Sequence, residues 1–374
     1  MKKIIFALAG LCLVMASCSE PKSPTKTPVD GMKVAYMVNM PQSEIFALCS
    51  EGFTTTADKL GMIPDTYYFT NLEELGMKAS DLIEQGYKGL FLSHLQPEFA
   101  YVLVNTLEQL YPDAKLVTFD TEFRNLEGKI VTFPNVTQLF QNDEALSQQL
   151  LDYICTLKKD ATPAKVLKIW DGPGKLAAFD RRDIAYTNYE NSNKIETVAT
   201  IGICQTAEDN FDEKILDAEN IIYNQVKEYL AGYQEGAIDA IWCAFDVYAQ
   251  GCYKALKELN LNIPMVSADI SNQDIQAMTA VGSPWKASAC TDFRANGEQG
   301  LRILALELNN QYQDIKVPFP VDEDLYIEMP PTLIEANILT PSTTVNNLKD
   351  VAPASYGDPA NYVTCDWMKE AIGY

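Results

Sequence analysis

Two aspartates close apolar, strand-like runs, and a carboxylate in that position needs a physical explanation. Asp120 lies in "LVTFDTEF" (residues 116–123), Asp269 lies in "MVSADISN" (residues 265–272), and Asp246 ends a third run, "AIWCAFD". An unpaired carboxylate is costly to bury away from water. Catalysis, metal coordination, hydrogen bonding to a ligand, or capping of a helix would each explain such an acid.

The remaining residues give little support for catalysis or metal binding. His94 is the single histidine and no G-x-S-x-G occurs, so a serine triad lacks a base. One histidine without a Cys or His neighbour at ligand spacing does not predict a zinc site. Glycoside hydrolysis would require Asp120 and Asp269 to face each other, with the pKa of one carboxyl raised. We therefore expect no catalytic residue, no metal and no cofactor. His94 is either a residue at the mouth of a site or an ordinary loop histidine.

The N-terminus indicates export. A basic start precedes an apolar run over residues 4–15, which is too short to span a bilayer. The run ends in "LVMASC", where Cys18 directly follows two small residues, and this resembles a bacterial lipoprotein signal. We expect removal of residues 1–17 and lipidation of Cys18, on the periplasmic or cell-surface side of a membrane. An ordinary secretory signal with a chance cysteine is the alternative. Residues 18–31 then form a tether.

The charge of the chain excludes nucleic acid as a partner. The sequence carries 29 basic and 51 acidic side chains, a formal net charge of −22. Residues 1–17 contain two lysines and no acids, so their removal leaves 27 basic side chains and a net charge of −24. Such a charge opposes phosphate backbones and anionic lipid surfaces. Membrane attachment should therefore come from the lipid on Cys18.

Strand-like and helix-like patterns alternate from Lys33 onward, in two similar halves. The first half has strand patterns at residues 33–38, 66–69, 88–92 and 114–119, with helical spacing between them. After Pro134 a helical pattern over residues 139–157 starts a second series, with strands at 165–170, 197–204, 237–244 and 263–268. This alternation predicts an α/β fold of two doubly wound parallel-sheet lobes joined by a hinge. Ligands of such sheets bind beyond the carboxyl ends of the strands, so the aspartates indicate a cleft between the lobes.

The chain resembles the type I periplasmic sugar-binding proteins, which include ribose-binding proteins, from about residue 33 to residue 337. The resemblance rests on the order and spacing of "VAYMVNMPQSEIF", "GYKGLFLS", "KLVTFDTEF", "FDRRDIAY", "DAIWCAFDVYAQGCYKALKELN", "IPMVSADIS" and "ASACTDFRANGEQG". It implies a monomeric, non-enzymatic solute-binding protein that delivers a monosaccharide or related polyol to an ABC permease. A periplasmic sensor module that binds a sugar-like signal for a receptor kinase is the alternative.

The resemblance also implies ligand contacts at eight positions: Asn39, Phe46, Asp120, Arg182, Phe245, Asp246, Asp269 and Thr291. Phe245 stands where the family has an asparagine, and Thr291 stands where it often has a glutamine. The choice of Arg182 over its neighbour Arg181 rests on the family spacing alone. The loss of two amides implies a less polar or a larger ligand.

A sugar suits these residue types, because carboxylates and a guanidinium satisfy neighbouring hydroxyls in pairs. An aromatic ring would cover the apolar face of the sugar. The candidates for this ring are Phe46, Phe245, Trp170, Trp242 and Trp285, although Trp242 lies within a strand pattern and is expected in the core.

The N-terminal signal and the family resemblance together predict five parts of the chain. Residues 1–17 are a signal peptide and residues 18–31 a tether. An N-terminal lobe comprises residues 32–134 and 292–322, and a C-terminal lobe comprises residues 135–291 and 323–341. The chain would thus cross between the lobes near residues 134, 291 and 322. Residues 342–374 form a C-terminal extension, which is rich in aromatic residues and is therefore expected to pack on a lobe.

Overall fold

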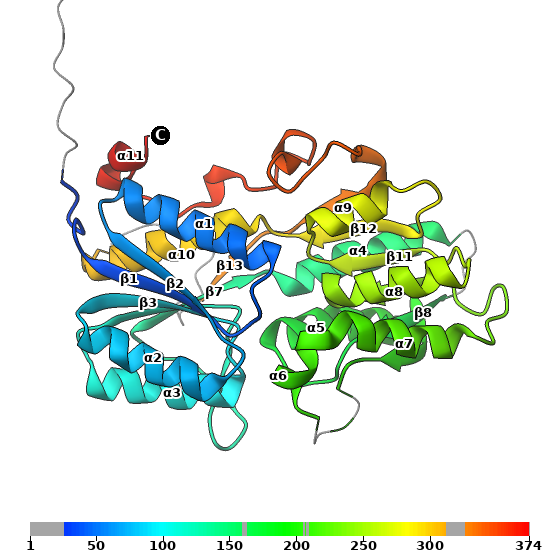
Figure 1. The fold of residues 1–374 in the computed structure, drawn as a ribbon, viewed down its shortest axis with the longest axis horizontal. Helices are drawn as coiled ribbons and strands as arrows, with labels where there is room; N and C mark the ends of the chain where they lie inside the picture. Colours follow the sequence, from blue (N-terminus) through cyan, green and yellow to red (C-terminus); the bar gives the residue numbers. More distant parts are fainter. Residues whose placement is uncertain (1–25, 159–162, 205, 207–208, 312–325, 374) are drawn as a thin grey trace, which may run out of the picture.

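The computed structural model describes residues 26–158, 163–204, 206, 209–311 and 326–373. The predicted signal peptide, the lipidation site Cys18 and the predicted crossing near residue 322 lie outside these residues. The described chain forms two lobes, each a six-stranded sheet with helices on both faces (Figure 1). The predicted α/β fold with two parallel-sheet lobes is therefore confirmed. No helix in the described ranges is long and apolar enough to cross a membrane.

The N-terminal lobe is built on an entirely parallel sheet. Its strands lie in the order β13 (Tyr326–Met329), β7 (Val136–Gln141), β4 (Lys115–Phe119), β3 (Tyr87–Ser93), β1 (Lys33–Val38) and β2 (Ile63–Tyr68). Helices α1 (Glu44–Lys59) and α10 (Phe293–Leu308) cover one face, and α2 (Leu72–Glu84) and α3 (Pro97–Leu110) cover the other (Figure 1). The central strands are buried on both sides, which explains their almost continuous apolar runs.

The C-terminal lobe repeats this plan with one antiparallel edge strand. Its order is β14 (Thr332–Glu335), β12 (Trp285–Cys290), β11 (Met265–Ala268), β10 (Ala240–Cys243), β8 (Ala164–Ile169) and β9 (Ile195–Ile201), with β14 antiparallel. Helices α4 (Asp143–Leu157) and α5 (Ala177–Asn191) pack together on one side of the sheet. The other side carries α7 (Ala218–Leu230), α8 (Asp246–Glu258) and α9 (Asn272–Thr279). Between β9 and β10 the chain forms α6 (Phe211–Lys214), a 3₁₀ turn (Ile215–Asp217) and α7 rather than one continuous helix.

The chain crosses between the lobes at three places beside the sheets. The first crossing follows Gln141, later than the expected residue 134, because β7 is fully buried between β4 and β13 in the N-terminal sheet. The second crossing joins β12 to α10 through Thr291 and Asp292. The third joins β13 to β14 through residues 330–331, so the segment 323–341 contributes a strand to each sheet rather than to the C-terminal lobe alone.

The C-terminal extension contacts both lobes. It begins beside α9, where the Val345 amide donates to Asn272 Oδ1 at 2.9 Å. It then passes along α10, where the Val363 amide donates to Gln299 Oε1 at 2.8 Å. The extension ends in α11 (Asp366–Ile372), which packs near α1 (Figure 1). The chain thus returns to the N-terminal lobe and makes a fourth connection between the lobes.

Helices α1 and α10 approach each other closely because each has a glycine at the contact. A methyl group placed at Gly52 would lie 1.9 Å from the carbonyl oxygen of Arg294. One placed at Gly297 would lie 1.9 Å from the carbonyl oxygen of Cys49. The two backbones therefore touch without intervening side chains. This contact fixes α10 directly after the second crossing.

Candidate functional site

Three polar residues follow the strands of the two sheets in the same unusual backbone conformation. His94 follows β3, Asp120 follows β4 and Asp269 follows β11, with φ angles of 59°, 43° and 64°. Positive φ is uncommon for residues other than glycine and is found at sites where function fixes the backbone. All three side chains are buried. Asp120 and Asp269 thus occupy equivalent positions in the two lobes.

The Asp120 carboxylate is held by the first crossing. Its Oδ1 accepts a hydrogen bond from the Gln141 backbone amide at 2.9 Å, and its Oδ2 accepts one from Gln141 Nε2 at 3.0 Å. The Gln141 side chain also accepts a hydrogen bond from Thr291 Oγ1 at 2.8 Å, so it connects the first crossing to the second. Asn296 Nδ2 in turn donates to Thr291 Oγ1 at 2.6 Å.

Arg182 joins the acids of the C-terminal lobe. Its Nε donates to Asp143 Oδ1 at 2.8 Å, and its Nη1 donates to Asp269 Oδ2 at 3.3 Å and to the Ala244 carbonyl at 2.5 Å. Arg182 and both carboxylates are almost completely buried. We use the name inter-lobe site for the set Asn39, His94, Asp120, Gln141, Asp143, Arg182, Asp269 and Thr291.

Burial dominates the ionisation of the inter-lobe site. Burial, together with the nearby Asp143 carboxylate, raises the pKa of Asp120 to about 8. Burial also raises the pKa of Asp269, a rise that the Arg182 guanidinium opposes. Burial, together with the nearby Arg182 guanidinium, lowers the pKa of His94 to about 3. His94 is therefore neutral at neutral pH, and its 3.8 Å approach to Asp120 is not an ion pair.

Two buried oxygens of the inter-lobe site have no hydrogen-bond partner among the described residues. They are Oδ1 of Asn39 and Oδ1 of Asp269, which lie beyond the ends of β1 and β11 in opposite lobes. A buried acceptor without a donor costs free energy, and native structures provide a partner for nearly all such groups. Both atoms would be satisfied by a ligand that donates hydrogen bonds.

Hydrogen bonds also join the lobes around this site. Gln96 Nε2 donates to Asp212 Oδ1 at 3.2 Å, and the backbone amide of Asn272 donates to Glu44 Oε2 at 2.6 Å. Burial raises the pKa of Asp212, and hydrogen bonds from Asn39 and Gln96 oppose that rise. The lobes are therefore in contact, with the polar residues enclosed between them.

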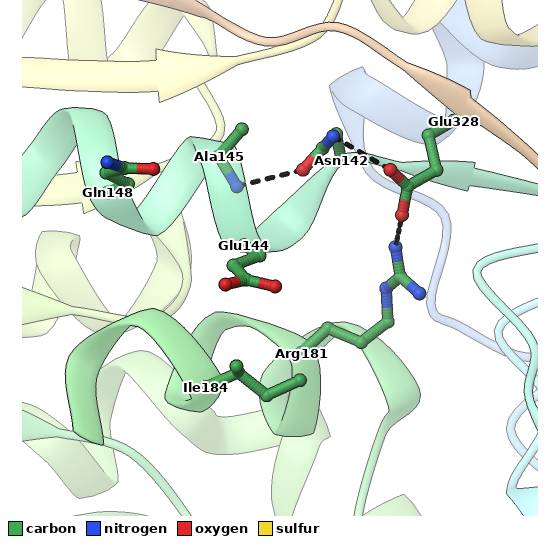
Figure 2. A pocket seen from close by; sticks show the side chains of 7 residues that line it. All are labelled: Asn142, Glu144, Ala145, Gln148, Arg181, Ile184 and Glu328. Atoms are coloured by element: carbon green, nitrogen blue, oxygen red, sulfur yellow. Dashed lines mark hydrogen bonds and ion pairs between the residues drawn. The ribbon is translucent and has the colours of Figure 1, made fainter. Parts of the chain in front are cut away.

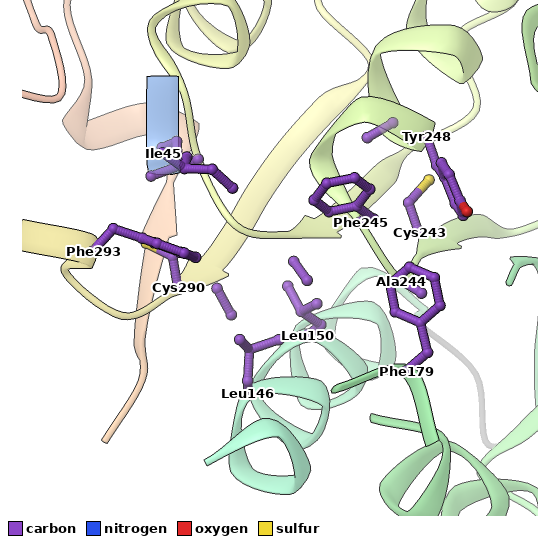
Figure 3. Close-up of a cluster of buried hydrophobic side chains, with 14 of the residues drawn as sticks. Ile45, Leu146, Leu150, Phe179, Cys243, Ala244, Phe245, Tyr248, Cys290 and Phe293 are labelled. Carbon is purple, nitrogen blue, oxygen red and sulfur yellow. The ribbon is translucent and has the colours of Figure 1, made fainter. Parts of the chain in front are cut away.

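Aromatic side chains lie on both sides of the acids. Phe46 meets His94 edge-on at 4.9 Å between ring centroids, and Phe293 at 6.1 Å. In the C-terminal lobe, Phe245 packs against Phe179 and Tyr248 (Figure 3). Phe245 is therefore part of an apolar aromatic cluster in this lobe.

The tryptophans considered for an aromatic contact differ in their surroundings. Trp242 is fully buried against Tyr186, and Trp285 is fully buried with its indole N–H donating to Ser288. Both therefore pack in the core of the C-terminal lobe, as expected for Trp242. Trp170 is only partly buried and carries the Lys168 ammonium over its ring at 4.1 Å.

Asp246 and Thr291 are buried but have partners within the protein. Asp246 Oδ1 accepts a hydrogen bond from the Val247 amide at 2.8 Å, at the start of α8. Burial raises the pKa of Asp246 well above its ordinary value, and Asp274 and Asp269 raise it further. Thr291 donates to Gln141, as described above. The side chain of Thr291 therefore contributes to the connection between the crossings.

Arg181 lies at the edge of the inter-lobe site, where its Nε donates to Asp143 Oδ2 at 3.3 Å and its Nη2 donates to the Gln141 carbonyl at 3.2 Å. It forms an ion pair with Glu328 of β13, and Glu328 also accepts a hydrogen bond from Asn142 at 2.8 Å (Figure 2). These residues line a cavity of about 290 Å³ between α4, α5 and β13. The structure thus distinguishes two adjacent arginines that the sequence alone could not separate.

Gln141 and Asp143 belong to the site but were absent from the sequence-based set. Both fall within the helix predicted over residues 139–157, where Gln141 would be an ordinary polar position and Asp143 an ordinary first-turn acid. The available signal for a strand was the β-branched pair Val136 and Thr137 followed by the apolar pair Leu139 and Phe140. No group of three or more His, Cys, Asp or Glu side chains in the described part of the chain could hold a metal ion.

Solved structures with the same architecture are numerous. One is a sugar ABC transporter protein from Yersinia enterocolitica, 25% identical, with a TM-score of 0.73 over 91% of this chain and 95% of that one. Another is a 5-methylthioribose transporter solute-binding protein from Thermotoga lettingae, 19% identical, with a TM-score of 0.75 over 91% of this chain and 98% of that one. The chain has the fold of the type I periplasmic binding proteins.

The resemblance seen in the sequence is thus confirmed by structure. A myo-inositol-binding protein from Caulobacter has the same fold at 14% identity, with a TM-score of 0.64 over 86% of this chain and 95% of that one. No protein-family model matches the chain, and no curated protein matches it. In open sheets of this kind, ligands bind beyond the carboxyl edges of the parallel strands. The inter-lobe site lies at these edges.

Proposed function

We propose that the protein is an exported, lipid-anchored solute-binding protein that captures a sugar or related polyol between its lobes and delivers it to an ABC permease. The observation that carries this proposal is the convergence of Asp120, Arg182 and Asp269 from two lobes into one buried network. The names of the similar structures, which are sugar transporter components and an inositol-binding protein, support the same ligand class.

The chemistry of the site favours a hydroxyl-rich ligand. Asn39 Oδ1 and Asp269 Oδ1 can each accept a hydrogen bond from a ligand, and a hydroxyl group donates one while still accepting another. The rings of Phe46 and Phe245 lie on opposite lobes and suit the apolar face of a sugar ring. Enclosure between the lobes would follow hinge closure, as in other two-lobed binding proteins.

A ligand screen tests the proposal. We expect at least one of ribose, D-arabinose, glucose, myo-inositol, allitol and 5-methylthioribose to raise the melting temperature. The rise should be about 3–5 °C at a hundredfold excess over Kd, because binding stabilises the folded state by about 2.7 kcal/mol there. Differential scanning fluorimetry measures the rise, and isothermal titration calorimetry gives Kd.

Two variants make the screen specific. Asp120→Ala should abolish the rise in melting temperature for the ligand that binds. Asp58→Ala, which removes an exposed acid on α1, should retain it. If no compound shifts the wild-type protein, the sugar and polyol class is wrong.

The lipid anchor is tested separately. In bacterial cells, we expect the wild-type protein to incorporate a radiolabelled fatty acid and to fractionate with membranes. Cys18→Ser should lose both the label and the membrane association, because the apolar run over residues 4–15 is too short to span a bilayer. Membrane fractionation of Cys18→Ser that equals the wild type would contradict the proposed anchor.

A further inference from the structure

We propose that Gln141 is the positioning residue of the inter-lobe site, which holds the Asp120 carboxylate toward the ligand and couples it to the crossings between the lobes. This inference rests on the proposed function for its ligand. It concerns a residue that has no role in the set derived from the sequence. The hydrogen bonds around Gln141 carry the inference.

The contacts of Gln141 leave little freedom at Asp120. The backbone amide and Nε2 of Gln141 each donate to a different oxygen of Asp120, at 2.9 and 3.0 Å. A carboxylate that accepts two hydrogen bonds from one residue is fixed in both position and rotation. The group can still bind a ligand hydroxyl, through a free lone pair or, when it is protonated, through its O–H. Gln141 therefore decides in which direction this hydrogen bond points.

Gln141 also connects this acid to the parts of the chain that bend. It is the last residue of β7, directly before the first crossing. Its side-chain oxygen accepts from Thr291, which lies in the second crossing and accepts from Asn296 of α10. Its backbone carbonyl accepts from Arg181 Nη2 of the C-terminal lobe at 3.2 Å. A change in the angle between the lobes must therefore act on the residue that holds Asp120.

The acid–base surroundings of Asp120 provide a readout that needs no ligand. Asp120 faces His94 after β3, Cys49 on α1, Asp143 at the start of α4 and Arg182 on α5. Burial and then Asp143 raise its pKa to about 8, whereas the hydrogen bonds from Gln141 lower it. Loss of the Gln141 amide should therefore raise this pKa further.

The sign of the stability effect follows from proton binding. Below the pKa of the unfolded state, about 3.9, Asp120 is protonated in both states. Between that value and about 8 the folded state holds the extra proton, so the contribution of Asp120 to stability falls as pH rises. The decrease ends above the folded pKa. In Gln141→Leu the decrease should continue to higher pH.

The experiment compares Gln141→Leu with Gln138→Leu. Gln138 lies on the same strand and is equally buried, but its amide donates to the backbone carbonyl of Thr121 at 3.0 Å. Urea unfolding between pH 5 and 9 is measured for each protein and for the same protein with Asp120→Asn. The difference in free energy of unfolding between a protein and its Asp120→Asn partner gives the contribution of Asp120 to stability. We expect this contribution to level off near pH 8 in the wild type and in Gln138→Leu, and still to fall at pH 9 in Gln141→Leu.

Binding provides the second readout. For whichever compound of the screen binds, Gln141→Leu should weaken affinity at least tenfold, and Gln138→Leu should change it less than twofold. Levelling of the Asp120 contribution at the same pH in the wild type and Gln141→Leu would overturn the positioning role. A loss of affinity in Gln138→Leu as large as that in Gln141→Leu would also overturn it. If no compound binds the wild type, the proposed function fails, while the urea series still decides the role of Gln141.

Discussion

Replacement of Arg182 by methionine is expected to lower the free energy of unfolding by about 3–5 kcal/mol and to abolish ligand binding. The guanidinium is buried and is shared by Asp143, Asp269 and the Ala244 carbonyl. Methionine has a similar volume but no charge, so the buried Asp269 carboxylate would lose its counter-ion, and Asp143 would keep only its 3.3 Å contact with Arg181. Urea unfolding measures the loss of stability, and calorimetry with a compound from the screen measures the loss of binding.

Two further variants test whether the loss of stability comes from the buried charges around Arg182 rather than from packing. Arg181→Met removes the adjacent, more exposed arginine and should cost less stability. Adding Asp143→Asn and Asp269→Asn to Arg182→Met also removes the two buried acidic charges that Arg182 balances. This triple variant should therefore regain stability without regaining ligand binding. A stable Arg182→Met protein that binds ligand with wild-type affinity would contradict the network described here.

Gly297→Ala is expected to destabilise the protein by about 3 kcal/mol or more, the upper end of the usual cost of overpacking. Its methyl group would lie 1.9 Å from the carbonyl oxygen of Cys49, which belongs to the backbone of α1. Neither helix can relieve this contact by a side-chain rotation, so α1 and α10 would have to separate. Thermal and urea unfolding measure the loss.

Gly232→Ala is the matched control for this substitution. Gly232 follows α7, and a methyl group there has no atom within 4 Å. We expect its stability to remain within about 0.5 kcal/mol of the wild type. Equal stabilities for Gly297→Ala and Gly232→Ala would show that the contact between α1 and α10 tolerates a methyl group.

The alternation of strand and helix patterns was sufficient to predict the two lobes. Buried parallel strands such as "GLFLS" leave nearly continuous apolar runs, and an acid directly after such a run is conspicuous. Asp120 and Asp269 were therefore found at the correct edge of each sheet. Their shared positive φ could not be read from the sequence, because aspartate adopts that conformation only where the surrounding structure enforces it.

The residues that were missed belong to a strand with mixed polarity. β7 reads "VTQLFQ", and its polar members Gln138 and Gln141 are buried because they bond to the neighbouring strand ends. Hydrophobic periodicity does not detect a buried polar residue whose partners are distant in the sequence. The start of the helical pattern was consequently placed too early. Gln141 and Asp143 therefore fell within the predicted helix, and the first crossing was placed before β7.

The C-terminal extension has a mechanical consequence. It brings the chain back to the N-terminal lobe, so both ends of the described chain lie there, with Thr27 bonded to Leu60 and α11 beside α1 (Figure 1). The C-terminal lobe is therefore an insert whose covalent connections all lead to its partner lobe. A pulling force between the two ends would first act on the extension and the N-terminal lobe. The bending of one lobe against the other would thus be shielded from tension on the N-terminus.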